Sequence, residues 1–207
     1  MIKNIIFDIG GVINNWEIND LISHFTNNDD EKKLLLDYVY NAPEWAKEGL
    51  FDKGLITHDE FSLKVQERTN HVNDELIHNF IMNYYKFFYI NPKVCDLMMD
   101  LKEKGYKVYV LSNISDYIIS KMNCHELFLD KIDGYVLSYI EQEIKPYENI
   151  YDILLSRYNL IPEESLFIDD MEENVVTANK LGIKGRKVIR NSYEDIINIL
   201  KEYKVIE

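Results

Sequence analysis

The sequence is poor in cysteine, in positive charge and in long apolar runs, and each shortage excludes a class of protein. Its two cysteines, Cys95 and Cys124, are too few for a disulfide framework and lack the spacing of a zinc site. Lys and Arg number 23 against 36 Asp and Glu, a net charge of −13, which disfavours nucleic acid and anionic membranes as partners. No stretch approaches the roughly 20 apolar residues of a membrane span, and Asp8 interrupts the apolar amino terminus, which is too short for a signal peptide. We therefore expect a cytoplasmic protein.

Repeats, low-complexity tracts and Gly/Ser linkers are also missing, so we expect no long flexible tether between parts of the chain. The 207 residues suit one domain with a smaller inserted subdomain. Short runs rich in β-branched residues predict strands that are buried on both faces, at 5–7, 108–111, 135–137, 166–168 and 188–189. Amphipathic stretches alternate with them from residue 91 onward, which favours an α/β fold: a doubly wound parallel sheet with helices on both faces.

The segment from about residue 15 to residue 90 has no convincing strand and shows the 3.6-residue period of helices. Within it, Thr57 and Glu60 have the spacing of a capping box at a helix start. We expect 1–14 and 91–207 to form the α/β core and 15–90 to form a small helical cap, inserted after the first strand and packed on the sheet. The aromatic stretch at 84–89 is expected to pack between cap and core, with a ligand platform or a dimer contact as alternatives.

Polar residues follow the first two predicted strands of the core, at the sheet edge where parallel α/β proteins bind ligands. Asp8 follows the first strand and precedes Gly10 and Gly11, whose backbone N–H groups can approach an anion. Ser112 and Asn113 follow the next strand and can hold a phosphate. Each feature taken alone also has a structural explanation, because aspartate and asparagine often cap helices or turns and paired glycines often form turns.

A lysine and a pair of carboxylates occupy comparable places later in the chain. Lys145 precedes Pro146 at the entry to a predicted helix, where the helix dipole does not favour a cation. Asp169 and Asp170 end another buried strand, and two adjacent carboxylates there repel each other unless a cation such as Mg²⁺ compensates them. A solvated surface lysine and a helix-capping acidic pair are the alternatives.

The combination is more specific than its parts. A nucleophilic carboxylate, a hydroxyl with an amide, a lysine and an acidic pair, all at one sheet edge, predict phosphoryl transfer through an aspartyl phosphate. Receiver domains use similar groups, but there the acidic pair comes first in the chain. Here the order is Asp8, Ser112, Lys145 and then Asp169-Asp170, so that interpretation is disfavoured.

These motifs resemble those of the haloacid dehalogenase-like hydrolase superfamily. The matching segments cover nearly the whole chain: Phe7-Asp8-Ile9-Gly10-Gly11-Val12, Leu111-Ser112-Asn113, Lys145-Pro146, and Ile168-Asp169-Asp170 with Asn174. The helical insert also falls where one class of these enzymes carries its cap.

The resemblance implies a Mg²⁺-dependent phosphatase acting on a small phosphorylated metabolite. We expect a monomer or a homodimer. Asp8 would attack phosphorus. Mg²⁺ would be held by the Asp8 carboxylate, the Gly10 carbonyl oxygen and Asp170, with Asp169 close by. Ser112 and Asn113 would bind phosphate oxygens, and Lys145 would neutralise charge between the nucleophile and the phosphoryl group.

One position departs from the pattern of the family. Most phosphatases of the superfamily carry a second aspartate two residues after the nucleophile, where this chain has Gly10, and glycine cannot shuttle a proton. Either the leaving group needs little protonation, or a cap residue such as Glu17, Glu44 or His58 replaces the acid, or the protein is a weak enzyme or a binding module.

The first motif and the segment 52–57 are similar to a subset of the superfamily that includes phosphatases of sugar phosphates such as glucose 1-phosphate. This similarity favours a sugar phosphate as the substrate. The alternatives are a metal-independent 2-haloacid dehalogenase, which also lacks the second aspartate, and a non-catalytic phosphate-binding or regulatory protein.

Overall fold

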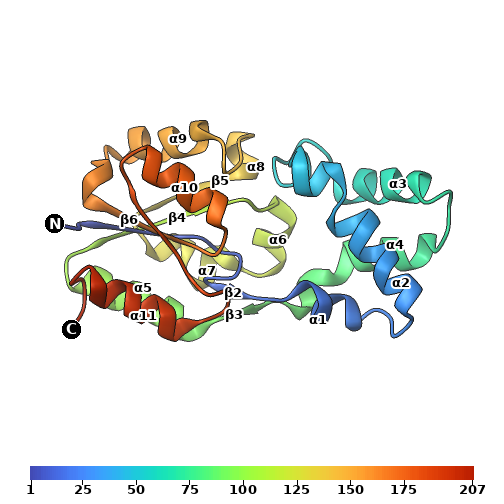
Figure 1. The fold of residues 1–207 in the computed structure, drawn as a ribbon, viewed down its shortest axis with the longest axis horizontal. Helices are drawn as coiled ribbons and strands as arrows, with labels where there is room; N and C mark the ends of the chain where they lie inside the picture. Colours follow the sequence, from blue (N-terminus) through green and yellow to red (C-terminus); the bar gives the residue numbers. More distant parts are fainter.

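The computed structural model describes residues 1–207 apart from the side chain of Lys47. A five-stranded sheet lies at its centre in the order β5-β4-β1-β6-β7, and all its neighbouring strands run parallel (Figure 1). Its strands are β1 (Asn4–Phe7), β4 (Lys107–Ser112), β5 (Gly134–Leu137), β6 (Ser165–Asp169) and β7 (Lys184–Lys187). The amino-terminal strand β1 is central, because Phe7 lies opposite Val110 of β4 on one side and Ile168 of β6 on the other.

Helices cover both faces of this sheet, which confirms the predicted doubly wound α/β fold. Side chains alternate along a strand, so Ile5 and Phe7 enter one buried apolar cluster while Ile6 enters another. Helices α5 and α11 contribute to the first cluster, and α9 and α10 to the second. Figure 1 shows the two pairs on opposite sides of the sheet. Their bounds are α5 (Pro92–Glu103), α9 (Glu148–Tyr158), α10 (Glu172–Lys180) and α11 (Tyr193–Glu202).

A helical part lies beside the sheet, at the right of Figure 1. It comprises α1 (Ile18–Ser23), α2 (Asp29–Leu34), α3 (His58–Arg68), α4 (Asp74–Asn83), the π-helical segments Leu35–Tyr40 and Pro43–Lys47, and the 3₁₀ turn Tyr84–Phe87. The predicted capping box is confirmed at α3, since Thr57 Oγ1 accepts from the Glu60 N–H and Glu60 accepts from the Thr57 N–H.

Two short strands that were not predicted join the helical part to the sheet. β2 (Asn14–Asn15) and β3 (Tyr89–Ile90) pair antiparallel, with Asn14 opposite Ile90. We propose that this pair holds together the two crossings between a core of 1–14 and 91–207 and a cap of 15–90. Because both crossings share one ladder, they enter and leave the cap side by side.

The strand predicted at 188–189 is wrong. The structure forms the fifth strand at β7, whose residues Lys184 to Lys187 lie opposite Leu166 to Asp169. An edge strand has one neighbour and needs no continuous apolar run, so its polar sequence concealed it. Val188 is still buried and its N–H donates to the Asp169 carbonyl at 3.0 Å, whereas Ile189 is 69% exposed.

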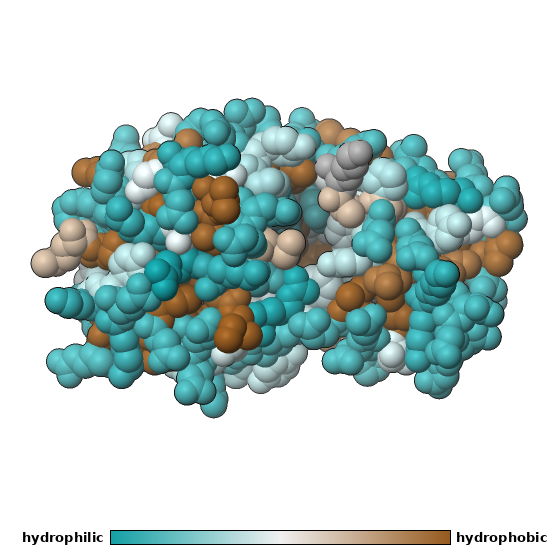
Figure 2. Space-filling view, in the orientation of Figure 1, coloured by the Kyte–Doolittle hydropathy of each residue, from teal (hydrophilic) through white to brown (hydrophobic). Residues whose placement is uncertain are grey.

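The remaining short helices are α6 (Asp116–Lys121), α7 (Cys124–Leu127) and α8 (Ser138–Glu141), with 3₁₀ turns at Leu129–Lys131 and Pro162–Glu164. On the face drawn in Figure 2, hydrophilic residues cover most of the surface and hydrophobic residues are scattered in small groups. None of the helices in the described chain combines the length and apolar character that crossing a bilayer requires.

Candidate active site

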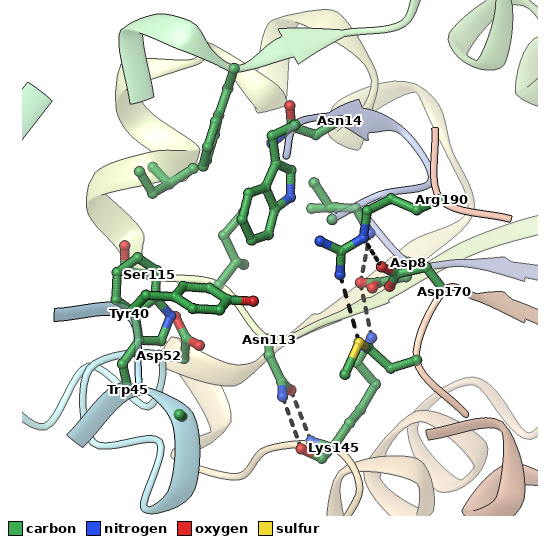
Figure 3. Close-up of a pocket in the computed structure, with 18 of the residues that line it drawn as sticks. Asp8, Asn14, Tyr40, Trp45, Asp52, Asn113, Ser115, Lys145, Asp170 and Arg190 are labelled. Carbon is green, nitrogen blue, oxygen red and sulfur yellow. Dashed lines mark hydrogen bonds and ion pairs between the residues drawn. The ribbon is translucent and has the colours of Figure 1, made fainter. Parts of the chain in front are cut away.

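A cavity of about 350 Å³ lies between the ends of the central strands and the helical part. Figure 3 shows residues from both parts around it: Asp8, Asn113, Lys145, Asp170 and Arg190 from the sheet side, and Tyr40, Trp45 and Asp52 from the helical side. Residues far apart in the sequence meet here because parallel strands end at a common edge.

A buried lysine lies between two carboxylates at the sheet side of the cavity, where Lys145 and Asp8 line the cavity and Asp169 is fully buried next to them. Lys145 Nζ lies 2.9 Å from Asp8 Oδ1 and 2.6 Å from Asp169 Oδ2, and it also donates to the Leu111 carbonyl at 3.0 Å. The exposed fractions of the three side chains are 1%, 9% and 0% for Lys145, Asp8 and Asp169. All three donors of the ammonium group therefore have partners, and the lysine is held in one position.

Asp169 is held firmly by its own neighbours. One carboxylate oxygen accepts the Met171 N–H at 2.8 Å, and the Asn174 amide lies 3.0 Å from both oxygens. Asn174 stands on the first turn of α10 and is buried. This arrangement fixes the carboxylate that in turn orients Lys145.

Three carboxylates converge on one point, because ligand oxygens of Asp8, Asp169 and Asp170 lie within 4.8 Å of one another. Burial raises the pKa of Asp8 to about 7; the charge of Lys145 opposes this, and Asp169 and Asp170 add to it. Burial likewise raises the pKa of Asp170, against the charge of Arg190. Burial alone would lower the pKa of Lys145, but Asp169 and Asp8 raise it above its ordinary value. Hard oxygen donors with excess negative charge fit Mg²⁺.

Arg190 is a site residue that the sequence did not reveal. Its Nε donates to Asp170 Oδ2 at 2.6 Å, and its guanidinium lies 4.9 Å from the Trp16 ring centroid. The Asp170 and Arg190 side chains pack so closely on the backbone of Gly11 that this position requires glycine. Its φ is +69°, and a Cβ there would lie 2.6 Å from Asp170 Oδ2. An isolated arginine after an edge strand carries no sequence signal, so only the folded chain identifies it.

The residues predicted to bind phosphate have different surroundings. The Asn113 side chain donates to the Lys145 carbonyl at 2.9 Å and accepts the Lys145 N–H at 2.8 Å (Figure 3), so it positions the lysine backbone. The hydroxyls of Ser112 and Ser115 are buried without a hydrogen-bond partner among the described residues. Buried hydroxyls normally have partners, and of these two serines Ser115 lines the cavity.

Five aromatic rings in the lining of the cavity form a closed circle of contacts, the aromatic circle. Neighbouring ring centroids lie 5.3–6.0 Å apart in the order Trp16, Tyr40, Trp45, Tyr84, Phe88 and back to Trp16. All five residues line the cavity. Tyr84 and Phe88 of the aromatic stretch therefore line the cavity, whereas the sequence predicted that this stretch packs between cap and core.

The structure places none of the three predicted cap candidates in the cavity. Glu17 is exposed, and Glu44 is paired with Arg68 at 2.6 Å. His58 is buried against the rings of Phe51 and Tyr117, and burial lowers its pKa to about 4. Asp52 lines the cavity instead. The sequence marks the segment 52–57 as similar to a subset of the superfamily but does not identify Asp52 as a site residue.

Comparisons with known proteins agree with this fold. The profile of the haloacid dehalogenase-like hydrolase family matches residues 2–182. A D-ribitol-5-phosphate phosphatase of Bacteroides thetaiotaomicron is 28% identical over 196 residues, covering 89% of this chain and 90% of that protein. A sesquiterpene phosphatase of Aspergillus oryzae is 25% identical, with 88% of both chains covered.

A solved haloacid dehalogenase family enzyme of Bacteroides thetaiotaomicron, in complex with magnesium and inorganic phosphate, has a TM-score of 0.72 and 29% identity, covering 95% of this chain and 99% of that one. The chain therefore belongs to the haloacid dehalogenase-like hydrolase family. The predicted family and the predicted hydrolase class are confirmed.

Proposed function

We propose that the protein is a Mg²⁺-dependent phosphatase that hydrolyses a small phosphomonoester through an aspartyl phosphate on Asp8. The observation that carries this proposal is the buried contact of Lys145 with Asp8 and Asp169, next to a cavity that Lys145, Asp8 and the convergent Asp170 line. Two relatives that match this chain over most of their length are named as phosphatases, which supports the proposal.

The residues have distinct parts in this chemistry. An Asp8 carboxylate oxygen attacks phosphorus as the bond to the substrate oxygen breaks, and water then cleaves the acyl phosphate. Lys145 Nζ, held against Asp8, stabilises negative charge on the phosphoryl oxygens. The Ser112 hydroxyl and the second N–H of the Asn113 amide remain to bind phosphate.

We propose that the Asp8 and Asp170 carboxylates and the Gly10 carbonyl hold Mg²⁺, with Asp169 close by. Bound there, Mg²⁺ would neutralise phosphate charge and draw Asp8 into its ionised, nucleophilic form. Arg190 pairs with Asp170 at 2.6 Å and has a side chain 25% exposed, and we propose that it shifts toward solvent when Asp170 takes a metal.

A sugar phosphate such as glucose 1-phosphate is the proposed substrate. The aromatic circle offers flat apolar faces for the C–H surface of a sugar, and the side chains of Asn14 and Asn41 in the same lining offer hydrogen bonds to hydroxyls. The Bacteroides relative is named for a sugar alcohol phosphate. The convergent carboxylates disfavour the metal-independent dehalogenase, for which they would be an unneeded repulsion.

The test is phosphate release from a panel of sugar and other metabolite phosphates, with Mg²⁺ or with EDTA. We expect metal-dependent turnover by the wild type. Asp8→Asn should lower kcat by about 10³-fold or more, because the amide cannot form the covalent bond. Circular dichroism should show an unchanged fold.

Asp37→Asn serves as the matched control, because Asp37 is an exposed aspartate of the helical part. Full activity of Asp8→Asn would contradict the nucleophile assignment. Halide release from 2-chloropropionate in EDTA would support the dehalogenase, and tight binding of a fluoride-metal phosphate mimic without any turnover would support a binding protein.

A further inference from the structure

The cavity contains a carboxyl group that the chemistry described so far does not use. Among the residues described in its lining, the carboxyl groups are those of Asp8, Asp52 and Asp170. Asp8 is paired with Lys145 and Asp170 with Arg190. The Asp52 carboxylate has no hydrogen-bond or ion-pair partner in the part of the chain that the structure describes.

Hydrolysis of a sugar or alkyl phosphate needs such a group. An alkoxide is a poor leaving group, and protonating it in the transition state commonly contributes about 10²–10⁴-fold to the rate. Position 10, two residues after the proposed nucleophile, is glycine and supplies no proton. Lys145 is engaged on all three of its donors and is not free to serve.

The position of Asp52 suits an in-line displacement. In such a reaction the leaving oxygen lies on the side of phosphorus opposite the nucleophile. Asp8 and Asp170 stand on the sheet side of the cavity and Asp52 on the helical side (Figure 3). A substrate phosphate on Asp8 therefore directs its leaving oxygen toward the wall that carries Asp52.

The backbone around Asp52 is anchored to the sheet domain. Ser138 Oγ donates to the Asp52 carbonyl at 2.6 Å and accepts the Ile114 N–H at 2.8 Å. Gly54, with φ +67°, packs its backbone against Tyr139. One serine thus ties Asp52 to the loop that follows β4 and carries the proposed phosphate ligands.

The charged and titratable groups around Asp52 leave its proton available near neutral pH. Burial raises its pKa to about 7, opposed by the charge of Lys145. Tyr84, whose own pKa is raised by burial and by the charge of Asp52, stays protonated. A carboxyl group of this kind can both give and take a proton at physiological pH.

We propose that Asp52 is the general acid and base of this phosphatase, acting from the helical part in place of a residue at position 10. The proposal rests on the proposed function. As the Asp8 oxygen bonds to phosphorus and the bond to the substrate oxygen breaks, the Asp52 carboxyl gives its proton to that oxygen, which leaves as a neutral alcohol. In the second step a water molecule gives a proton to the Asp52 carboxylate while the water oxygen bonds to phosphorus. The bond from phosphorus to the Asp8 oxygen breaks, which releases phosphate and restores Asp8.

The experiment compares two substrates that differ in their need for a proton. Glycerol 3-phosphate has an alkoxide leaving group, whereas p-nitrophenyl phosphate releases a stable phenolate. Asp52→Asn should lower kcat/KM for glycerol 3-phosphate by about 10²-fold or more and leave that for p-nitrophenyl phosphate within about threefold. It should also produce a burst of p-nitrophenolate, because hydrolysis of the aspartyl phosphate has lost its base.

A second variant makes the test independent of stability. A Cβ at Gly10 would meet only Trp16 Nε1 within 4 Å, at 3.6 Å, an ordinary contact, so a side chain can start there. Adding Gly10→Asp to Asp52→Asn should restore kcat/KM for glycerol 3-phosphate at least about tenfold and leave p-nitrophenyl phosphate unchanged. Asp37→Asn, an exposed site, is the control.

Equal losses with both substrates, or no loss with either, overturn the role of Asp52 while the wild-type activity upholds the proposed function. Absence of metal-dependent turnover by the wild type on these two substrates and on every member of the panel of sugar and metabolite phosphates overturns the proposed function, and this proposal with it.

Discussion

The individual charged residues of this site are buried and depend on one another for compensation of their charge. Lys145 and Asp169 have almost no exposed side-chain surface, and Asp8 has little. Taking one member from such a group leaves the others buried and uncompensated, which is costly. The residues that do the proposed chemistry are thus also charges that hold one another in place.

The raised pKa of Asp52 makes the stability of the protein depend on pH. The pKa is about 7 in the fold and about 3.9 in an unfolded chain. Between these values the folded state keeps a proton that the unfolded state has lost, so the free energy of unfolding falls as the pH rises from about 4 to about 7. Asp52→Asn should therefore be more stable than the wild type at pH 8, by a margin that shrinks toward pH 5.

Urea denaturation in EDTA at pH 5, 6.5 and 8 measures this margin. The exposed Asp37→Asn variant should differ from the wild type by the same amount at each pH. A margin for Asp52→Asn that does not change with pH would contradict the raised pKa.

Among the structural elements, the start of α8 has a disproportionate influence. Ser138 is fully buried, and its hydroxyl joins the Asp52 carbonyl from the helical part to the Ile114 N–H of the loop after β4. The short helix α8 therefore connects three segments that are distant in the sequence.

Ser138→Ala should destabilise the protein by about 1–3 kcal/mol, because it leaves a buried N–H and a buried carbonyl without their partner. It should also lower kcat/KM for glycerol 3-phosphate more than for p-nitrophenyl phosphate, since Asp52 loses its anchor. Thermal denaturation and steady-state kinetics check both effects. Ser120→Ala on the exposed face of α6 is the control, and equal stability of the two variants would contradict the anchoring role.

At the scale of the whole molecule, the cavity exists only because two parts of the chain face each other across β2 and β3. The sheet side contributes charge, and the helical side contributes the aromatic circle and Asp52. The charge of −13 also weakens the compact state by self-repulsion. A divalent cation bound among three carboxylates should relieve part of that cost.

Magnesium should therefore raise the melting temperature beyond what salt alone achieves. At a hundred times its dissociation constant, a ligand that binds only the folded state adds about 2.7 kcal/mol. Thermal unfolding in MgCl₂ should exceed that in NaCl of equal ionic strength, and EDTA should reverse the difference. Asp170→Asn should abolish it, whereas Asp37→Asn should keep it; equal shifts in both salts would contradict a specific site.

Local patterns predicted much of the fold. The buried runs at β1, β4, β5 and β6 and the capping box at Thr57 lie where the sequence indicated. The edge strand β7 was misplaced and the pair β2 and β3 was missed. The polar edge strand β7 and the two-residue strands β2 and β3 bury little apolar surface, so they leave no periodic pattern; long-range pairing alone creates them.

The sequence by itself predicted that Asp8, Ser112 and Asp169-Asp170 stand at the ends of strands of a parallel sheet and that Lys145 stands at the entry to a helix, because strand and helix patterns are local and such strands end at one edge. Only the tertiary structure decided which charges pair, that Arg190 reaches Asp170, and that Asp52 lines the cavity while Glu44 and His58 do not. The physical reason is that burial and pairing of a side chain depend on residues distant in the chain, whose approach no local pattern encodes.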